Sequence, residues 1–136
     1  MLYNYHFTLL CPFFSYFCPM NKIYYLSTCS TCTRIIKELK LHRDFKRQDI
    51  KTEKITSEQL EEMHKLSGSY ESLFSRAALK YRALGLHEQK LTEQDYRHHI
   101  LEEYTFLKRP VIIVGNQIFI GNAPKTVAAA KEALKQ

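Results

Sequence analysis

Short β-forming runs and helix-spaced apolar residues alternate along the chain after its first 19 residues. Residues 22–27, KIYYLS, are rich in β-forming side chains and predict a strand. From Ser30 the apolar positions recur at helical spacing as far as Leu39, which predicts an amphipathic helix. A second strand is predicted over residues 44–50, DFKRQDI. A strand, helix and strand of this length form a βαβ unit, with two parallel strands and a right-handed crossover.

Helical patterns fill the middle of the chain. Residues 56–59 and 92–95, TSEQ and TEQD, each have the spacing of a capping box, and Gly68 ends the first of these helices. A further helix is predicted over residues 71–86, with Gly85 as its stop. Its apolar face would hold Leu73, Phe74, Ala77, Ala78, Tyr81 and Leu84.

The chain returns to β structure near its end. Residues 111–114 and 117–120 are apolar runs divided by Gly115-Asn116, which predicts an antiparallel hairpin. Pro124 begins a last helix. Its inward-facing residues would be Val127, Ala130 and Leu134. The predicted order is βαβ, a helical insert over about residues 56–104, and then ββα, which is an α/β class of fold.

Composition narrows the function classes. A chain of 136 residues suits one domain, and no apolar stretch is long enough for an ordinary membrane span. The net charge of +6 favours an anionic partner, such as an oxyanion, an acidic protein or a nucleic acid. The cations are scattered, however, and the densest run, over residues 37–47, is typical of a solvated helix end and a polar turn.

The first 19 residues differ from the rest, because they are crowded with aromatic side chains and contain no Lys, Arg, Asp or Glu. Three explanations compete: a mis-set start with Met20 as the true first residue, a poor export signal, or a hydrophobic anchor. We favour the first. The domain is therefore predicted to cover residues 20–136, with residues 1–19 as an extension outside the fold.

Cys29 and Cys32 form a CxxC motif where the first predicted strand meets the first predicted helix. Four cysteines are too few to build a disulfide scaffold of this size. Tetrahedral zinc usually needs four ligands, and the spacing of Cys11 and Cys18 suits no common zinc motif. The order of strand, CxxC and helix instead favours a redox site over two merely packed thiols.

The position of Cys29 gives the physical reason. Unpaired backbone N–H groups and the positive end of the helix dipole stabilise a thiolate at a helix N-terminus. Cys29 should therefore be the more acidic and more exposed thiol. Cys32, one turn further on, is placed to resolve a mixed disulfide.

Four segments carry a wider resemblance: STCSTCTRIIKEL, FKRQDIKTEKIT, LFSRAALKYRALGL and TFLKRPVIIVGNQIFIGNAPKTV. Together they resemble the arsenate reductase/Spx family of thioredoxin-like proteins, from Lys22 to the C-terminus. The late KRP, followed by a hairpin and IG, makes the resemblance specific. It implies a four-stranded mixed sheet and a cis-proline at Pro110 that faces the active cysteine.

The resemblance also implies a chemistry. In the reductases, the cysteine that matches Cys29 attacks arsenate, and glutathione and glutaredoxin reduce the thiol-bound product, with no bound cofactor or metal. Three arginines hold the oxyanion; two match Arg109 and Arg76, while Asn122 stands about where the third is expected. Tyr25 replaces a histidine that the reductases carry before the cysteine.

Cys32 is usually missing from the reductases, and it points toward the Spx-type regulators. These proteins use a CxxC disulfide as a switch and bind the RNA polymerase α subunit, through a surface glycine that Gly68 would match. A plain thiol oxidoreductase is the third class. We expect a cytoplasmic protein that works through Cys29, with glutaredoxin or another thiol reductant as partner, and with no direct nucleic-acid or membrane contact.

Overall fold

The computed structural model describes residues 20–136, so the predicted apolar extension lies outside the described residues. Its elements, in chain order, are β1 (Met20–Tyr25), α2 (Ser30–Leu39), β2 (Lys46–Asp49), α3 (Ser57–Ser67), η1 (Glu71–Leu73), α4 (Leu79–Ala83), η2 (Leu86–Glu88), α5 (Glu93–Glu102), η3 (Tyr104–Phe106), β3 (Val111–Gly115), β4 (Gln117–Ile120) and α6 (Pro124–Leu134).

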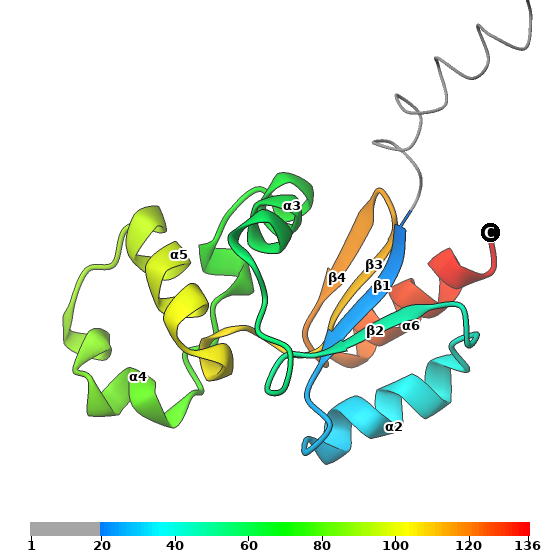
Figure 1. Cartoon of the computed structure of the whole chain (residues 1–136), viewed down its shortest axis with the longest axis horizontal. Coiled ribbons are helices and arrows are strands. Elements are labelled where there is room, and N and C mark those ends of the chain that lie inside the picture. The colour runs from blue at the N-terminus through cyan, green and yellow to red at the C-terminus, as the bar shows by residue number, and fades with distance from the viewer. Residues whose placement is uncertain (1–19) are drawn as a thin grey trace, which may run out of the picture.

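The four strands form one mixed sheet in the order β2-β1-β3-β4 (Figure 1). β1 and β2 are parallel and are connected by α2, while β3 runs antiparallel to both β1 and β4. The predicted βαβ unit and C-terminal hairpin are thus confirmed. Within the described residues, no helix is long and apolar enough to cross a membrane.

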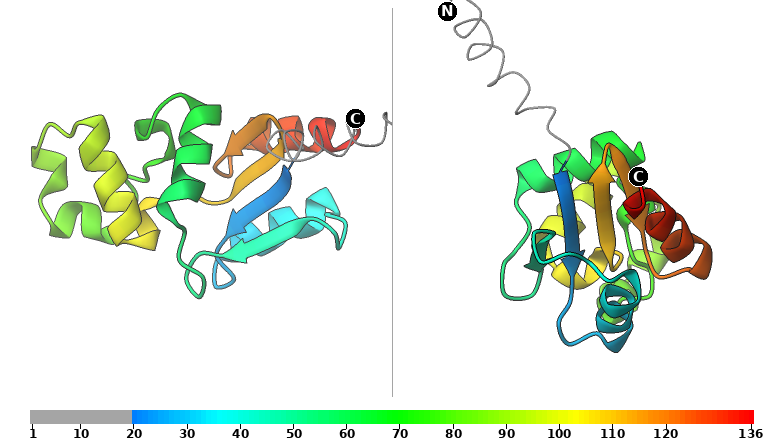
Figure 2. Two further views of the ribbon diagram at one scale, coloured as in Figure 1. Left: turned by 45° about the horizontal axis from the view of Figure 1, so that its top comes forward. Right: turned by 90° about the vertical axis from the view of Figure 1, so that its right-hand side faces the viewer.

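Both faces of the sheet are covered (Figure 2). Side chains alternate along the central strands, so Ile23 and Ile112 pack against α2 and α6, while Tyr24, Val111 and Ile113 pack toward α3. The α2 and α6 layer adds Ile35, Leu39, Leu41, Phe45, Val127 and Ala130. Helices α4 and α5 stand further from the sheet, beyond α3 (Figure 1).

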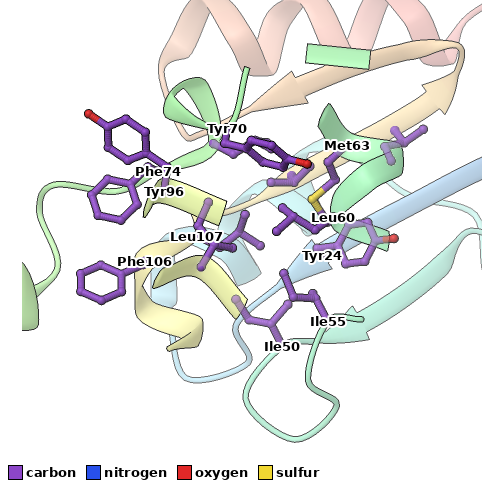
Figure 3. Packing of buried hydrophobic residues seen from close by; sticks show 14 of the residues in the cluster. Tyr24, Ile50, Ile55, Leu60, Met63, Tyr70, Phe74, Tyr96, Phe106 and Leu107 are labelled. Carbon is purple, nitrogen blue, oxygen red and sulfur yellow. The ribbon is translucent and has the colours of Figure 1, made fainter. Parts of the chain in front are cut away.

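An aromatic cluster ties the outer helices to the sheet (Figure 3). The Phe74 ring centroid lies 5.0 Å from that of Phe106 and 4.9 Å from that of Tyr96. Phe74 and Phe106 are fully buried, in the same core as Tyr24 of β1. Packing between the insert and the central strand therefore holds the helical segment in place.

The single helix predicted over residues 71–86 is wrong. The chain forms η1, then an extended bridge between Phe74 and Leu107, and only afterwards the short helix α4. The Ser75 N–H donates to the Phe106 carbonyl at 2.7 Å, and the Lys108 N–H donates to the Leu73 carbonyl at 2.8 Å. These hydrogen bonds between two segments of the chain use backbone groups that a continuous helix would need for its own hydrogen bonds.

The interruption of the predicted helix also explains why two apolar residues of this segment are exposed. Leu84 is 55% exposed and Ala77 is also exposed, although both were expected on the buried helical face. The helix signals on either side are confirmed, because the capping boxes of Thr56 and Thr92 are both formed. Gly85 lies in the left-handed region directly after the cap residue of α4.

Phe74→Ala tests the aromatic cluster. We expect the free energy of unfolding to fall by about 3–5 kcal/mol, since the change empties a buried ring site. Urea denaturation monitored by circular dichroism gives this value. Leu79→Ala is the control, because Leu79 is 91% exposed and its truncation should change stability by less than ~0.5 kcal/mol. Equal losses in the two variants would contradict the packing described.

Candidate active site

The register between β1 and β3 brings the CxxC motif to the segment before β3. Tyr24 pairs with Val111 in an antiparallel ladder, so the chain that leaves β1 meets the chain that enters β3. Cys29 follows β1 within a tight turn, in which its N–H donates to the Leu26 carbonyl at 3.0 Å. Arg109 and Pro110 immediately precede β3. Cys29 and Arg109, which are 80 positions apart in sequence, thus lie at the same end of the two central strands.

Cys29 is the N-cap residue of α2. Its backbone is extended, with φ −92° and ψ 112°, and its carbonyl accepts the Thr33 N–H at 3.2 Å. An N-cap side chain faces the free amides of the second and third helical residues, which here are Thr31 and Cys32. A serine or threonine would cap these amides with an oxygen, and in this chain they face a sulfur.

This environment lowers the pKa of Cys29. Partial burial acts to raise the pKa, and it is the largest single influence. The Cys32 amide, the Cys32 thiol, the Thr31 amide and the positive charge of Arg109 all act in the opposite direction, and together they outweigh burial. Cys29 is half-buried, so its thiolate can also be reached from solvent.

Cys32 has the opposite environment. It is fully buried, and burial together with the neighbouring Cys29 sulfur raises the pKa of Cys32 to about 11. The Leu26 amide and Arg109 act to lower this pKa but are outweighed. The pair therefore consists of one acidic, accessible thiol and one protonated, sheltered thiol, and both are free cysteines.

Arg109 and Pro110 form the short segment that enters β3. The Arg109–Pro110 peptide bond is cis, and Pro110 is buried, with its carbonyl accepting the Gly121 N–H at 2.9 Å. The charge of Arg109 acts on both thiols, while its Nη1 lies 3.5 Å from the Thr105 carbonyl oxygen. Within residues 20–136, no ion pair joins Arg109 to a carboxylate.

Arg76 lies in the insert, between the Phe74 bridge and α4, and its side chain is engaged elsewhere. Its Nη2 contacts Glu71 Oε1 at 2.7 Å and the Tyr96 hydroxyl at 2.9 Å. Glu71 is the main reason that the pKa of Arg76 is raised above its ordinary value. Arg76 is not among the groups that shift the pKa of either cysteine in the described structure.

Three further positions were singled out in the sequence. Tyr25 is half-buried in the layer of α2 and α6, and Asn122 is exposed between β4 and α6. Gly68 caps α3 with φ +86°, and a Cβ added there would meet nothing within 4 Å. Its backbone conformation explains this glycine, and its proposed polymerase contact stays a prediction.

Sequence reasoning missed the partners of Arg76. Neither Tyr96 nor Glu71 was given a role at the site. An acidic residue five positions before the arginine was a weak signal, because the two are brought together by η1 and the bridge rather than by a helix turn. Among residues 20–136, no cluster of three or more His, Cys, Asp or Glu side chains could hold a metal ion.

The family model named ArsC family matches residues 24–130, which include both cysteines, Arg76, Arg109 and Pro110. The chain belongs to the ArsC family. No curated protein sequence matches it. ArsC family membership supports a thiol-dependent oxidoreductase of the arsenate reductase type.

Solved structures agree on the fold. The YffB protein is 24% identical, with a TM-score of 0.68 over 82% of this chain and 98% of its own. An arsenate reductase (ArsC) related protein from Brucella melitensis is 25% identical, with a TM-score of 0.62 over 81% and 92% of the two chains. An arsenate reductase from Vibrio cholerae is 19% identical, with a TM-score of 0.64 over 81% and 98% of the two chains. The fold is thus thioredoxin-like, as the sequence predicted.

A matched pair of Cys32 variants tests the thiol environment. Cys32→Ser keeps a hydroxyl donor to Cys29, whereas Cys32→Ala removes it. The pKa of Cys29 should therefore be higher in Cys32→Ala than in Cys32→Ser, and Cys29 should remain the first thiol alkylated in the unmodified protein. The pH dependence of iodoacetamide labelling, read by mass spectrometry, measures both. Equal, slow labelling of the two cysteines would contradict the assignment.

Proposed function

We propose that this protein is a thiol oxidoreductase in which Cys29 is the nucleophile and Cys32 the resolving thiol, acting on arsenate or a related thiol/disulfide substrate. The position of Cys29 at the start of α2, with Cys32 buried one turn further on, carries the proposal, and the opposite pKa shifts of the two sulfurs agree with it. A nucleophile needs thiolate at neutral pH, and a resolving thiol is best kept protonated until the first bond has formed.

In the first step, on a disulfide, the Cys29 thiolate attacks one sulfur and the other sulfur leaves as a thiolate. A mixed disulfide between Cys29 and substrate results. On arsenate, the same thiolate displaces a hydroxyl oxygen, which leaves as water, and a sulfur–arsenic(V) bond forms. The positive charge of Arg109, which already acts on the Cys29 sulfur, would also favour an anionic substrate there.

The second step uses Cys32. Once Cys29 is bonded to substrate, its negative charge and its hydrogen bond no longer raise the pKa of Cys32, whereas the Leu26 amide and Arg109 still lower it. Cys32 then loses its proton and attacks the Cys29 sulfur. The substrate leaves with the electron pair, as a thiolate or as arsenite, and a Cys29–Cys32 disulfide remains.

Two equivalents of glutathione, or one dithiol glutaredoxin, would return the pair to the reduced state and become oxidised themselves. External glutathione could also replace Cys32 by attacking the Cys29 adduct. A site that must be re-reduced in this way fits a reducing compartment, so we propose a cytoplasmic location.

Turnover by the purified protein tests this function. We expect reduction of arsenate with glutathione and glutaredoxin, and reduction of hydroxyethyl disulfide with glutathione alone, each above the rate without the protein, and Cys29→Ser should abolish both gains. Cys32→Ser should abolish the internal disulfide but retain turnover that depends on external glutathione. Activity that persists in Cys29→Ser would exclude Cys29 as the nucleophile.

Arg109→Lys separates oxyanion binding from thiol chemistry. A lysine keeps the charge but loses the planar pair of donors that a guanidinium offers an oxyanion. We expect kcat/KM for arsenate to fall about tenfold or more, and to fall further than in Arg76→Lys, because Arg76 already shares its donors with Glu71. An unchanged arsenate rate in Arg109→Lys would remove the oxyanion role.

A redox regulator of the Spx type is the second candidate, and the CxxC pair is the observation that favours it. In that case the Cys29–Cys32 disulfide would be a switch for binding the RNA polymerase α subunit. A pull-down with the purified α subunit, in reduced and oxidised conditions, tests it. Redox-dependent capture without any turnover would favour the regulator over the enzyme.

A further inference from the structure

Glu71 holds Arg76 in a defined position. Besides the 2.7 Å contact with Glu71, the guanidinium carbon of Arg76 lies 5.7 Å from the centroid of the Tyr96 ring. The main chain of Glu71 is itself anchored, because its N–H and that of Tyr70 donate to the two oxygens of Glu93 at 3.0 and 2.9 Å. The carboxylate of Glu71 is thus presented to Arg76 by a fixed backbone.

The main chain at Arg76 and the side chain of Arg109 both lie near Thr105. Ser75 bonds to Phe106 across the bridge, so their chain neighbours Arg76 and Thr105 lie close together. Nη1 of Arg109 reaches the Thr105 carbonyl oxygen. The main chain that carries Arg76 and the side chain of Arg109 therefore both lie beside Thr105, although 33 residues separate the two arginines in sequence.

Carboxylates of the chain pair with two other cations near the bridge. Lys80 pairs with Glu103, which also accepts from the N–H and the hydroxyl of Thr105. Arg76 pairs with Glu71. In the part of the chain that the structure describes, Arg109 alone of these three cations has no carboxylate partner.

We infer that Glu71 is a specificity-determining residue, which acts as an internal anion on Arg76. The inference rests on the proposed function. A multiply charged oxyanion that needs both arginines must displace the Glu71 carboxylate, whereas a neutral disulfide or a singly charged substrate does not need the second arginine. Glu71 thereby shifts the preference of Cys29 from oxyanions toward thiol/disulfide substrates.

The size of the effect follows from exposure. The Arg76 and Glu71 side chains are 48% and 54% exposed, and exposed ion pairs are weak. Displacing the carboxylate should therefore cost an oxyanion a modest factor in affinity. In Glu71→Gln the side chain keeps its shape and loses its charge, so we expect oxyanion binding to tighten by about two- to fivefold.

The experiment compares oxyanion and disulfide substrates in one set of variants. The ratio of kcat/KM for arsenate to that for hydroxyethyl disulfide should rise in Glu71→Gln. Glu102→Gln makes the same charge change at an exposed site on α5 and should leave the ratio unchanged. The double variant Arg76→Gln/Glu71→Gln should lose the gain. An unchanged ratio in Glu71→Gln, an equal gain in Glu102→Gln, or a gain that survives in the double variant would each overturn the inference.

A binding readout separates this inference from the proposed function. Arsenate or phosphate bound beside Arg109 should protect Cys29 from iodoacetamide, and half-protection should need less oxyanion in Glu71→Gln than in the unmodified protein. This measurement needs no turnover. Protection that tightens without catalysis would support the role of Glu71 and reject the reductase, whereas catalysis with identical protection in both proteins would reject the role of Glu71 alone.

Discussion

The antiparallel pairing of β1 with β3 is the interaction on which the site depends. Tyr24 lies opposite Val111, and both are fully buried, so the register is fixed by the core on that face of the sheet. A slip of one residue would turn Ile23 and Tyr24 to the opposite faces of the sheet and disrupt the packing of both layers of the core. The same register carries the end of β1 to the start of β3. Cys29 therefore meets the charge of Arg109 because two buried strands are aligned.

Asymmetry between the two thiols follows from where α2 begins. Cys29 precedes the first helical residue, so the free N–H groups at the start of α2 face its side chain. Cys32 lies within the first turn and is buried in the core. One helix start thus lowers one pKa and leaves the other to be raised by burial. The arginines show a parallel contrast, since Arg109 acts on the thiols while Arg76 is held by Glu71. In the proposed function, chemistry at the sulfur and selection of the substrate would be carried by different parts of the chain.

Local signals predicted most of the fold. The capping boxes at Thr56 and Thr92, the CxxC helix, and the hairpin over β3 and β4 all depend on neighbours within a few residues, and all are confirmed. The segment after Gly68 was predicted wrongly as one helix. Its apolar spacing is helical, but hydrogen bonds to residues 106–108 draw it into an extended bridge. A partner 33 residues away, as Leu107 is from Phe74, leaves no trace in local periodicity, so this break was not predictable.

By itself, the sequence determined the α/β class and which of the two cysteines is the more acidic. A CxxC between a strand and an amphipathic helix places one sulfur at free amides and the other on the buried face, and both consequences are local. Only the tertiary structure decided which charges surround the site. Arg109 reaches the thiols through strand pairing, and Glu71 reaches Arg76 through a bridge between distant segments. Electrostatic interactions depend on distance in space, and the sequence specifies that distance only after the chain has folded.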